Sequence, residues 1–193
     1  ILLKANWTGP THEYIFDDVT MTADLIAMKE GARYQDVSSS LVGMKDNPEF
    51  HGYFRLVSSG EPVNYVACYR YMIKIANEYG KGNTYTAVAQ ADIPGLSTTM
   101  YNKIRAAFSS NLHSKTLTFG TASQRKAFLF GVAMHIATDV FAHSTYERTS
   151  TSSPWTRIKH TGTPARADDP TVKPRRYIMA LRVERNTLYR FQQ

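Results

Sequence analysis

The chain has 193 residues, of which 42% are hydrophobic and 12% aromatic, with 23 Lys and Arg against 16 Asp and Glu. This length is enough to bury one sizeable core and short for two, so we expect a single compact domain over residues 1–193. No run of about 18 uncharged apolar residues occurs, which argues against a membrane-spanning helix and predicts a soluble protein. A single cysteine, Cys68, excludes an internal disulfide framework.

The net charge is +7, and much of the basic excess lies towards the C-terminus. Such a charge favours anionic partners, phospholipid surfaces or nucleic acids, although a solvated basic face explains it equally well. The sequence starts at Ile1, as it would after removal of a signal peptide or pro-segment, or if it is part of a longer chain. A secreted or periplasmic location is favoured, with a cytoplasmic one as the alternative, and the oligomeric state stays open.

Hydrophobic spacing and helix end signals predict an all-α fold. In chain order, we expect helices over residues 11–29, with Gly31 as the stop, and over residues 61–80, which end at Gly80. A shorter helix over residues 97–110 and a long one over residues 121–147 follow. A basic amphipathic helix over residues 175–193 closes the chain. Residues 34–62 and 149–174, rich in Ser, Gly, Pro and other turn-forming residues, read as long loops, and His113 reads as a solvated loop residue.

The long central helix carries four ionisable residues at intervals of four in "HIATDVFAHSTYE": His135, Asp139, His143 and Glu147. Steps of four keep side chains on roughly one helix face, so these groups can converge on one point. The flanking residues are almost all apolar, which indicates a helix inside the core, where polar groups need partners. Imidazole and carboxylate groups suit zinc. The alternative is a buried histidine and aspartate that are hydrogen-bonded to each other. Gly131, one turn earlier, predicts close approach of another helix or a ligand.

"HIATDVFAHS" resembles the zinc-dependent phospholipase C and single-strand nuclease superfamily, nearest the glycosylphosphatidylinositol-specific phospholipase D and Het-C-like branch, which has a His-x3-Asp-Val-x2-His-Ser pattern. "WTGPTHEYIF", with His12, is similar to the family's N-terminal element. "GARYQD", with Asp36, is similar to its Gly-Ala-x-x-Pro-Asp turn, except that Gln35 stands where the family usually has proline. His51 in "NPEFHGYF" follows in the family's order.

This resemblance implies two or three zinc ions in a single compact helical domain, with ligands that converge from several helices and loops. Asp36, His51, His135 and Asp139 would enclose one zinc, Asp139 would bridge to a second that His12 binds, and His143 would hold a third. The family completes the third site with a His-x3-Glu or His-x3-Asp pair, but Pro164 stands four residues after His160. His160 then pairs with Asp168 or Asp169, or else Glu147 supplies the ligand.

The function implied by the resemblance is zinc-dependent phosphodiester hydrolysis of the phospholipase C type, acting on phospholipids, with Asp36 as general base as well as ligand. One alternative is a single-strand nuclease on the same metals, in which Tyr53, Phe54 and Trp155 stack bases. The other is a non-catalytic binding module that a metal stabilises.

Overall fold

The computed structural model describes residues 22–38, 41, 47–52, 63–142, 145–147, 156–159 and 174–192. Its α-helices are α1 (Ala23–Val37), α2 (Tyr65–Gly80), α3 (Thr98–Ala107), α4 (His113–Leu117), α5 (Ala122–Ala142) and α7 (Pro174–Gln192). Two short 3-10 helices, η2 (Tyr85–Ala87) and η3 (Gln90–Asp92), lie between α2 and α3, and the π-helical turn η4 (Phe108–Leu112) joins α3 to α4. Strands β1 (Thr145–Glu147) and β2 (Thr156–Lys159) pair antiparallel. The predicted all-α class is confirmed, with this small hairpin as an addition.

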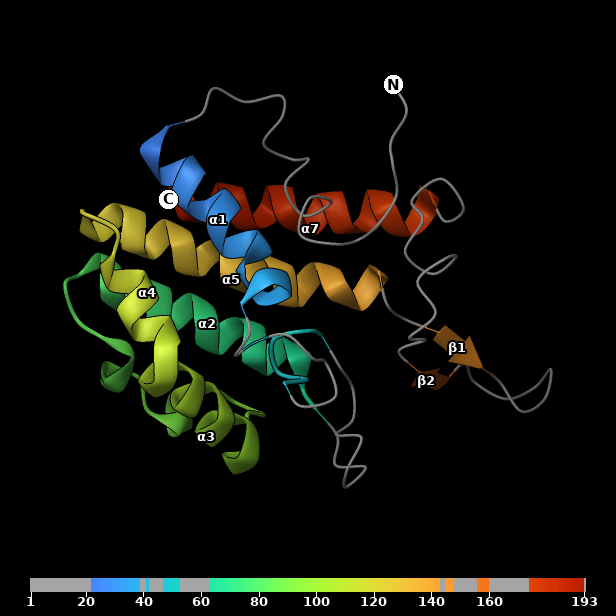
Figure 1. Cartoon of the computed structure of the whole chain (residues 1–193). Coiled ribbons are helices and arrows are strands. Elements are labelled where there is room, and N and C mark those ends of the chain that lie inside the picture. The colour runs from blue at the N-terminus through green and yellow to red at the C-terminus, as the bar shows by residue number, and fades with distance from the viewer. Residues whose placement is uncertain are drawn as a thin grey trace.

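Helix α5 runs through the middle of the molecule, and α1, α2 and α7 pack around it (Figure 1). Every residue from 127 to 136 is buried, as the almost wholly apolar sequence predicts. Thr121 and Gln124 have the sequence spacing of a capping box and form one at its start: the Gln124 amide donates to Thr121 Oγ1 at 3.1 Å, and the Thr121 amide donates to Gln124 Oε1 at 3.1 Å. The long helix therefore begins where the sequence predicts.

The end of this helix differs from the prediction. Helix α5 ends at Ala142, and Glu147 lies in β1 instead of on the helix. The residues after the apolar run include Ser144, Thr145 and Tyr146, which are weaker helix formers, and Thr and Tyr favour strands. No helical spacing therefore links Glu147 to His135 and Asp139.

Helix α1 also differs from the prediction. It begins after Thr22, whose Oγ1 accepts a hydrogen bond from the Leu25 amide at 3.2 Å, and it continues through Gly31 to Val37. Gly31 was wrongly predicted as a helix stop; residues 11–21 of the expected helix lie outside the described part. The "GARYQD" segment is helical instead of a turn, since Gln35 keeps the backbone amide that proline would remove.

Gly31 and Gly131 allow α1 and α5 to cross in backbone contact. A Cβ on Gly31 would lie 1.9 Å from Phe128 O, and a Cβ on Gly131 would lie 1.9 Å from Met28 O. Neither glycine can carry a side chain at this crossing. The prediction that Gly131 admits another helix is confirmed, and the close crossing places the last turn of α1 beside His135.

Helices α2 and α7 complete the core. Asn64 Oδ1 caps α2 by accepting from the Ala67 amide at 3.1 Å, and the helix ends at Gly80 as predicted. Pro174 begins α7, where its fixed φ suits the first helical position. Within α7, Leu188 and Phe191 pack against the core, whereas Tyr189 is 62% exposed. The last helix therefore packs on the core with only part of its apolar side chains.

The α3–η4–α4 segment brings His113 into a polar contact. His113 is the first residue of α4 and is half-buried, with its Nδ1 2.6 Å from the Tyr79 hydroxyl. The expectation of a solvated loop residue was wrong, because the π-helical turn carries the helix past "SSNL". Among the described helices, none combines the length and apolar character that membrane crossing requires.

Candidate metal centre

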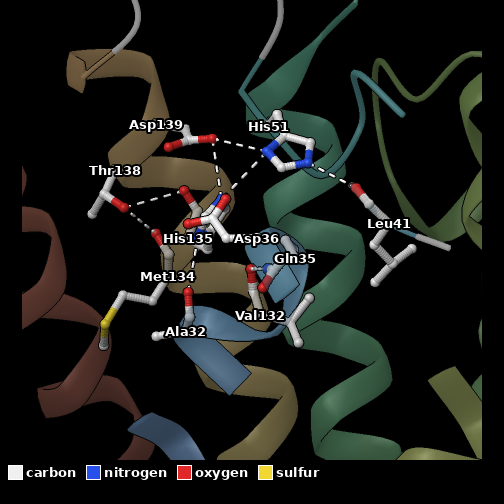
Figure 2. Close-up of polar contacts among 10 residues, drawn as sticks. All are labelled: Ala32, Gln35, Asp36, Leu41, His51, Val132, Met134, His135, Thr138 and Asp139. Atoms are coloured by element: carbon white, nitrogen blue, oxygen red, sulfur yellow. Dashed lines mark hydrogen bonds and ion pairs between the residues drawn. The ribbon is translucent and has the colours of Figure 1, made fainter. Parts of the chain in front are cut away.

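Three segments bring four ionisable side chains to one point (Figure 2). Asp36 comes from the last turn of α1, His51 from the short turn over residues 47–52, and His135 and Asp139 from successive turns of α5. His135 Nε2 lies 3.1 Å from Asp139 Oδ2 and 3.6 Å from Asp36 Oδ1. His51 Nδ1 lies 3.2 Å from the same Asp139 oxygen and 3.4 Å from His135 Nε2.

Backbone carbonyl oxygens fix the tautomers of both histidines. His135 Nδ1 lies 2.8 Å from Ala32 O, and His51 Nε2 lies 2.8 Å from Leu41 O (Figure 2). A carbonyl oxygen only accepts, so each of these ring nitrogens carries a proton and donates. In the neutral rings, the opposite nitrogens, His135 Nε2 and His51 Nδ1, then present lone pairs towards each other. This outer hydrogen bond to a carbonyl is the usual support of a metal-binding imidazole.

The spacing of the polar atoms around the two histidines suits a small divalent cation. Four ligands at the about 2.0–2.1 Å typical of zinc, in tetrahedral geometry, lie about 3.3–3.4 Å from one another. The measured separations that involve the two histidines run from 3.1 to 3.6 Å. Asp36, His51 and His135 each offer one atom within 4.8 Å of the others, a grouping that could hold a metal ion. Asp36 Oδ2 is buried and has no hydrogen-bond partner among the described residues, which leaves an acceptor without its donor.

Most of this cluster is buried, so the charge of each member strongly affects the pKa of its neighbours. The side chains of His51, His135 and Asp139 are 4%, 0% and 1% exposed, whereas that of Asp36 is 23% exposed. Burial alone would lower the pKa of His135, but the carboxylates of Asp139 and Asp36 outweigh it and raise this pKa to about 9. Without a metal, His135 is therefore protonated at neutral pH and donates to Asp139. A divalent cation bound at the centre would take the place of this proton.

The structure brings part of the predicted set together, and three of these residues, Asp36, His51 and His135, form a group that could hold a metal ion. Asp36, His51, His135 and Asp139 lie together as the resemblance implies. His12, His143, His160 and Asp168 lie outside the described residues. The prediction that Glu147 lies on the main helix is wrong, because this residue belongs to strand β1.

The sequence reading missed two groups beside the centre. Gln35 is fully buried, and its Nε2 donates to Val132 O at 2.8 Å, which ties the end of α1 to α5 (Figure 2). Glu49 is 1% exposed, and its burial raises the pKa of the carboxyl to about 7, against lowering by Lys103 and His51. The only sequence feature that distinguishes Gln35 is that it stands where the resembled family has proline. No sequence feature indicates that Glu49 is buried.

The chain matches no family model, no curated protein and no solved structure. The functional assignment therefore depends on the geometry of this centre and on the sequence pattern that led to it.

Proposed function

We propose that the protein is a zinc-dependent phosphodiester hydrolase of the phospholipase C type, with phospholipids as its substrates. The observation that carries the proposal is the convergence of His51 Nδ1, His135 Nε2 and carboxylate oxygens of Asp36 and Asp139, while the other nitrogen of each ring donates to a backbone carbonyl outside the centre. Such a donor set binds zinc. Further zinc ions would be held by Asp139 together with His12, and by His143.

His51, His135 and Asp139 are buried and would hold the zinc ion in place. Asp36 is partly exposed. His51 and His135, fixed by the carbonyls of Leu41 and Ala32, cannot turn without breaking those bonds. Zinc at such a site supplies Lewis acidity, which neutralises charge on a phosphoryl oxygen and lowers the pKa of water. Asp36 is the only partly exposed member of the four, so its carboxylate is the group that would serve as general base for a water that zinc activates.

Hydrolysis and metal content together test the proposal. Protein purified without chelator should carry zinc and cleave bis-p-nitrophenyl phosphate and a short-chain phosphatidylcholine, and chelator should abolish both activities until zinc is restored. Asp36→Asn should reduce turnover more than zinc content, whereas Asp92→Asn, on the exposed η3 turn, should change neither. Inert, fully zinc-loaded protein would contradict the proposal.

A metal-stabilised module without catalysis is the second candidate. Asp139 Oδ2 lies within 3.2 Å of both histidine nitrogens, beside the group of Asp36, His51 and His135 that could hold a metal ion. If all four side chains bound one zinc ion, the site would be closed, as structural zinc sites are. Cobalt substitution separates the two candidates, because a site closed by four protein ligands leaves no position for added phosphate. A cobalt spectrum that phosphate shifts favours the hydrolase, and an unchanged spectrum favours the module. The nuclease alternative predicts cleavage of single-stranded DNA without any lipid turnover.

A further inference from the structure

Two neighbouring cavities follow one side of α2. The first, of about 300 Å³, lies between α2, the η3 turn and α7, and the second, of about 250 Å³, lies between α2, α5 and α7. Tyr69 and Arg190 line both cavities, so the two meet at these side chains. Their α2 wall extends from Tyr65 to Lys74, about 14 Å along the helix axis. Together they form an elongated groove, the α2–α7 groove.

The part of the groove beside η3 is basic. Arg70 and Lys74 from α2 and Arg190 from α7 line it, against one carboxylate, that of Asp92. Within the part of the chain that the structure describes, neither arginine side chain forms a hydrogen bond or an ion pair. Asp92 Oδ2 accepts from the Ala89 amide at 2.9 Å, which holds this carboxylate on its own turn. Three cationic groups against one carboxylate leave an excess of two positive charges.

Lys74 has an acidic neighbour on its own helix, Glu78. Both Glu78 oxygens already accept hydrogen bonds, from Lys81 Nζ at 2.7 Å and from Asn83 Nδ2 at 2.8 Å. These two bonds lower the pKa of Glu78 more than Lys74 does. Glu78 is therefore neutralised by Lys81, and the charge of Lys74 adds to that of the groove.

The part of the groove between α2, α5 and α7 is mainly apolar. Val66, Phe141 and Val183 line it, and Val66 is 38% exposed. The Thr187 hydroxyl donates to Val183 O at 2.9 Å, so in its 3.2 Å contact with the Tyr69 hydroxyl it is Tyr69 that donates. Both hydroxyl protons are thus used within the protein. This wall suits a hydrocarbon chain.

The groove lies on the other side of α5 from the metal centre. Ala137 and Phe141 are its α5 wall, and each lies two positions along the helix from His135 or Asp139. Two positions turn a side chain by about 200° around an α-helix, because a turn takes 3.6 residues. A ligand in the groove would therefore not contact the proposed zinc site.

We propose that the α2–α7 groove binds a single-chain alkyl phosphate monoester. The phosphate lies beside Arg70 and Arg190, whose planar guanidinium groups suit its oxygens, and the chain lies along Val66 and Phe141. A phosphate monoester carries about 1.5 to 2 negative charges at neutral pH, which matches the excess of two positive charges better than a carboxylate does. This binding requires no hydrolysis, so it stands or falls separately from the proposed function.

Calorimetric titration of the whole chain with decyl phosphate, below its critical micelle concentration, tests the charged part. Decyl phosphate should bind more tightly than decanoate, because its head carries more charge. Arg70→Gln/Arg190→Gln should bind it about tenfold more weakly, as expected for the loss of two exposed ion pairs. The matched control is Arg182→Gln/Arg185→Gln, which removes the same charge from exposed positions on α7 outside both cavities and should bind as the unmodified protein does. Equal loss in both variants, or no loss in the first, would overturn the proposal.

The apolar part has its own comparison. Decyl phosphate should bind at least about tenfold more tightly than inorganic phosphate, because the groove buries part of the chain. Val66→Ser should weaken this binding, whereas Val37→Ser, at a 57% exposed position on α1, should leave it unchanged. Thermal unfolding of each variant checks that the fold is intact, and only variants that unfold like the parent are compared. Equal affinity for inorganic phosphate, or tighter binding of adenosine monophosphate, would contradict a site for an alkyl chain.

Chelator separates this groove from the metal centre. Binding of decyl phosphate should be the same with and without chelator, because the groove and the centre lie on opposite sides of α5. Asp92→Asn should strengthen binding, since it removes the one opposing charge in the groove. Binding that chelator abolishes would belong to the metal centre and would overturn the proposal. Binding that persists in protein without any hydrolytic activity would support the groove while contradicting the proposed function.

Discussion

His51 Nδ1 and His135 Nε2 face each other at 3.4 Å, and the other nitrogen of each ring lies 2.8 Å from a backbone carbonyl oxygen. The carbonyls of Leu41 and Ala32 thus set both rings for a cation in advance, so that little reorganisation opposes binding. Two neutral imidazoles alone would leave two lone pairs in contact. A proton or a metal ion must therefore occupy this point.

Zinc affinity should depend on pH because zinc displaces a proton from His135. The pKa of His135 lies near 9 in the metal-free protein, so the ring is protonated below that pH and competes with the metal. We expect the apparent zinc affinity to rise by about tenfold per pH unit between pH 6 and pH 8. Calorimetric titration in buffers of different ionisation enthalpy measures the protons released. Release of no proton at pH 7 would contradict a protonated His135.

The stability of the metal-free protein should change in the opposite direction. The pKa of His135 rises from an ordinary 6.5 to about 9 on folding, so its protonation stabilises the fold fully below pH 6.5. That stabilisation is lost as pH rises through about 9. Urea unfolding in chelator should give a lower free energy of unfolding at pH 9.5 than at pH 7. The Asp139→Asn variant, which lacks the carboxylate that contributes most to raising this pKa, should show a smaller decrease over the same range.

Gly131→Ala should separate α1 from α5. The added methyl would lie 1.9 Å from Met28 O, a backbone atom that cannot move without its helix. Overpacking of this kind costs about 1–3 kcal/mol or more, and here it also shifts Ala32 and Asp36 away from His135. Both thermal stability and zinc affinity should decrease. Gly120→Ala is the control, since its nearest neighbour would lie at 3.7 Å, and it should alter neither property.

Gln35 offers a test of how the end of α1 supports the centre. Gln35→Ala removes the hydrogen bond to Val132 O and should cost about 1 kcal/mol, because a buried acceptor loses its donor. Gln35→Pro, which restores the residue usual in the resembled family, should cost about 3 kcal/mol, because proline breaks the last turn of the helix. Urea unfolding and zinc titration of both variants measure this. Retained zinc binding in Gln35→Pro would show that Asp36 does not need the helix.

Much of the fold follows from local sequence signals. The apolar run from Ala127 to Ile136 and the Thr121–Gln124 capping box predict α5, and the four-residue spacing predicts that His135 and Asp139 act together. Asp36 and His51 are far away along the chain, and no local periodicity pairs them with α5. Only the order of residues in the resembled family links Asp36 and His51 to His135 and Asp139.

The errors have physical causes in tertiary contacts. Gly31 reads the same whether it ends a helix or permits a helix crossing, and only the backbone of Phe128 decides between the two. Glu147 continues the spacing of four, yet the helix ends where the apolar run gives way to Ser and Thr. The carbonyls of Ala32 and Leu41, which orient the histidines, belong to the backbone, so their side chains give no sign of the role.

Anomalous diffraction would show directly whether zinc occupies the point between His51 and His135. Crystals of the protein purified without chelator, measured at the zinc absorption edge, should give an anomalous peak about 2.0–2.1 Å from both His51 Nδ1 and His135 Nε2, with carboxylate oxygens of Asp36 and Asp139 beside it. His135→Ala should remove that peak. A well-ordered centre with no peak in zinc-soaked crystals, and with His135 Nε2 still 3.1 Å from Asp139 Oδ2, would show that a proton occupies the site and would contradict the metal centre.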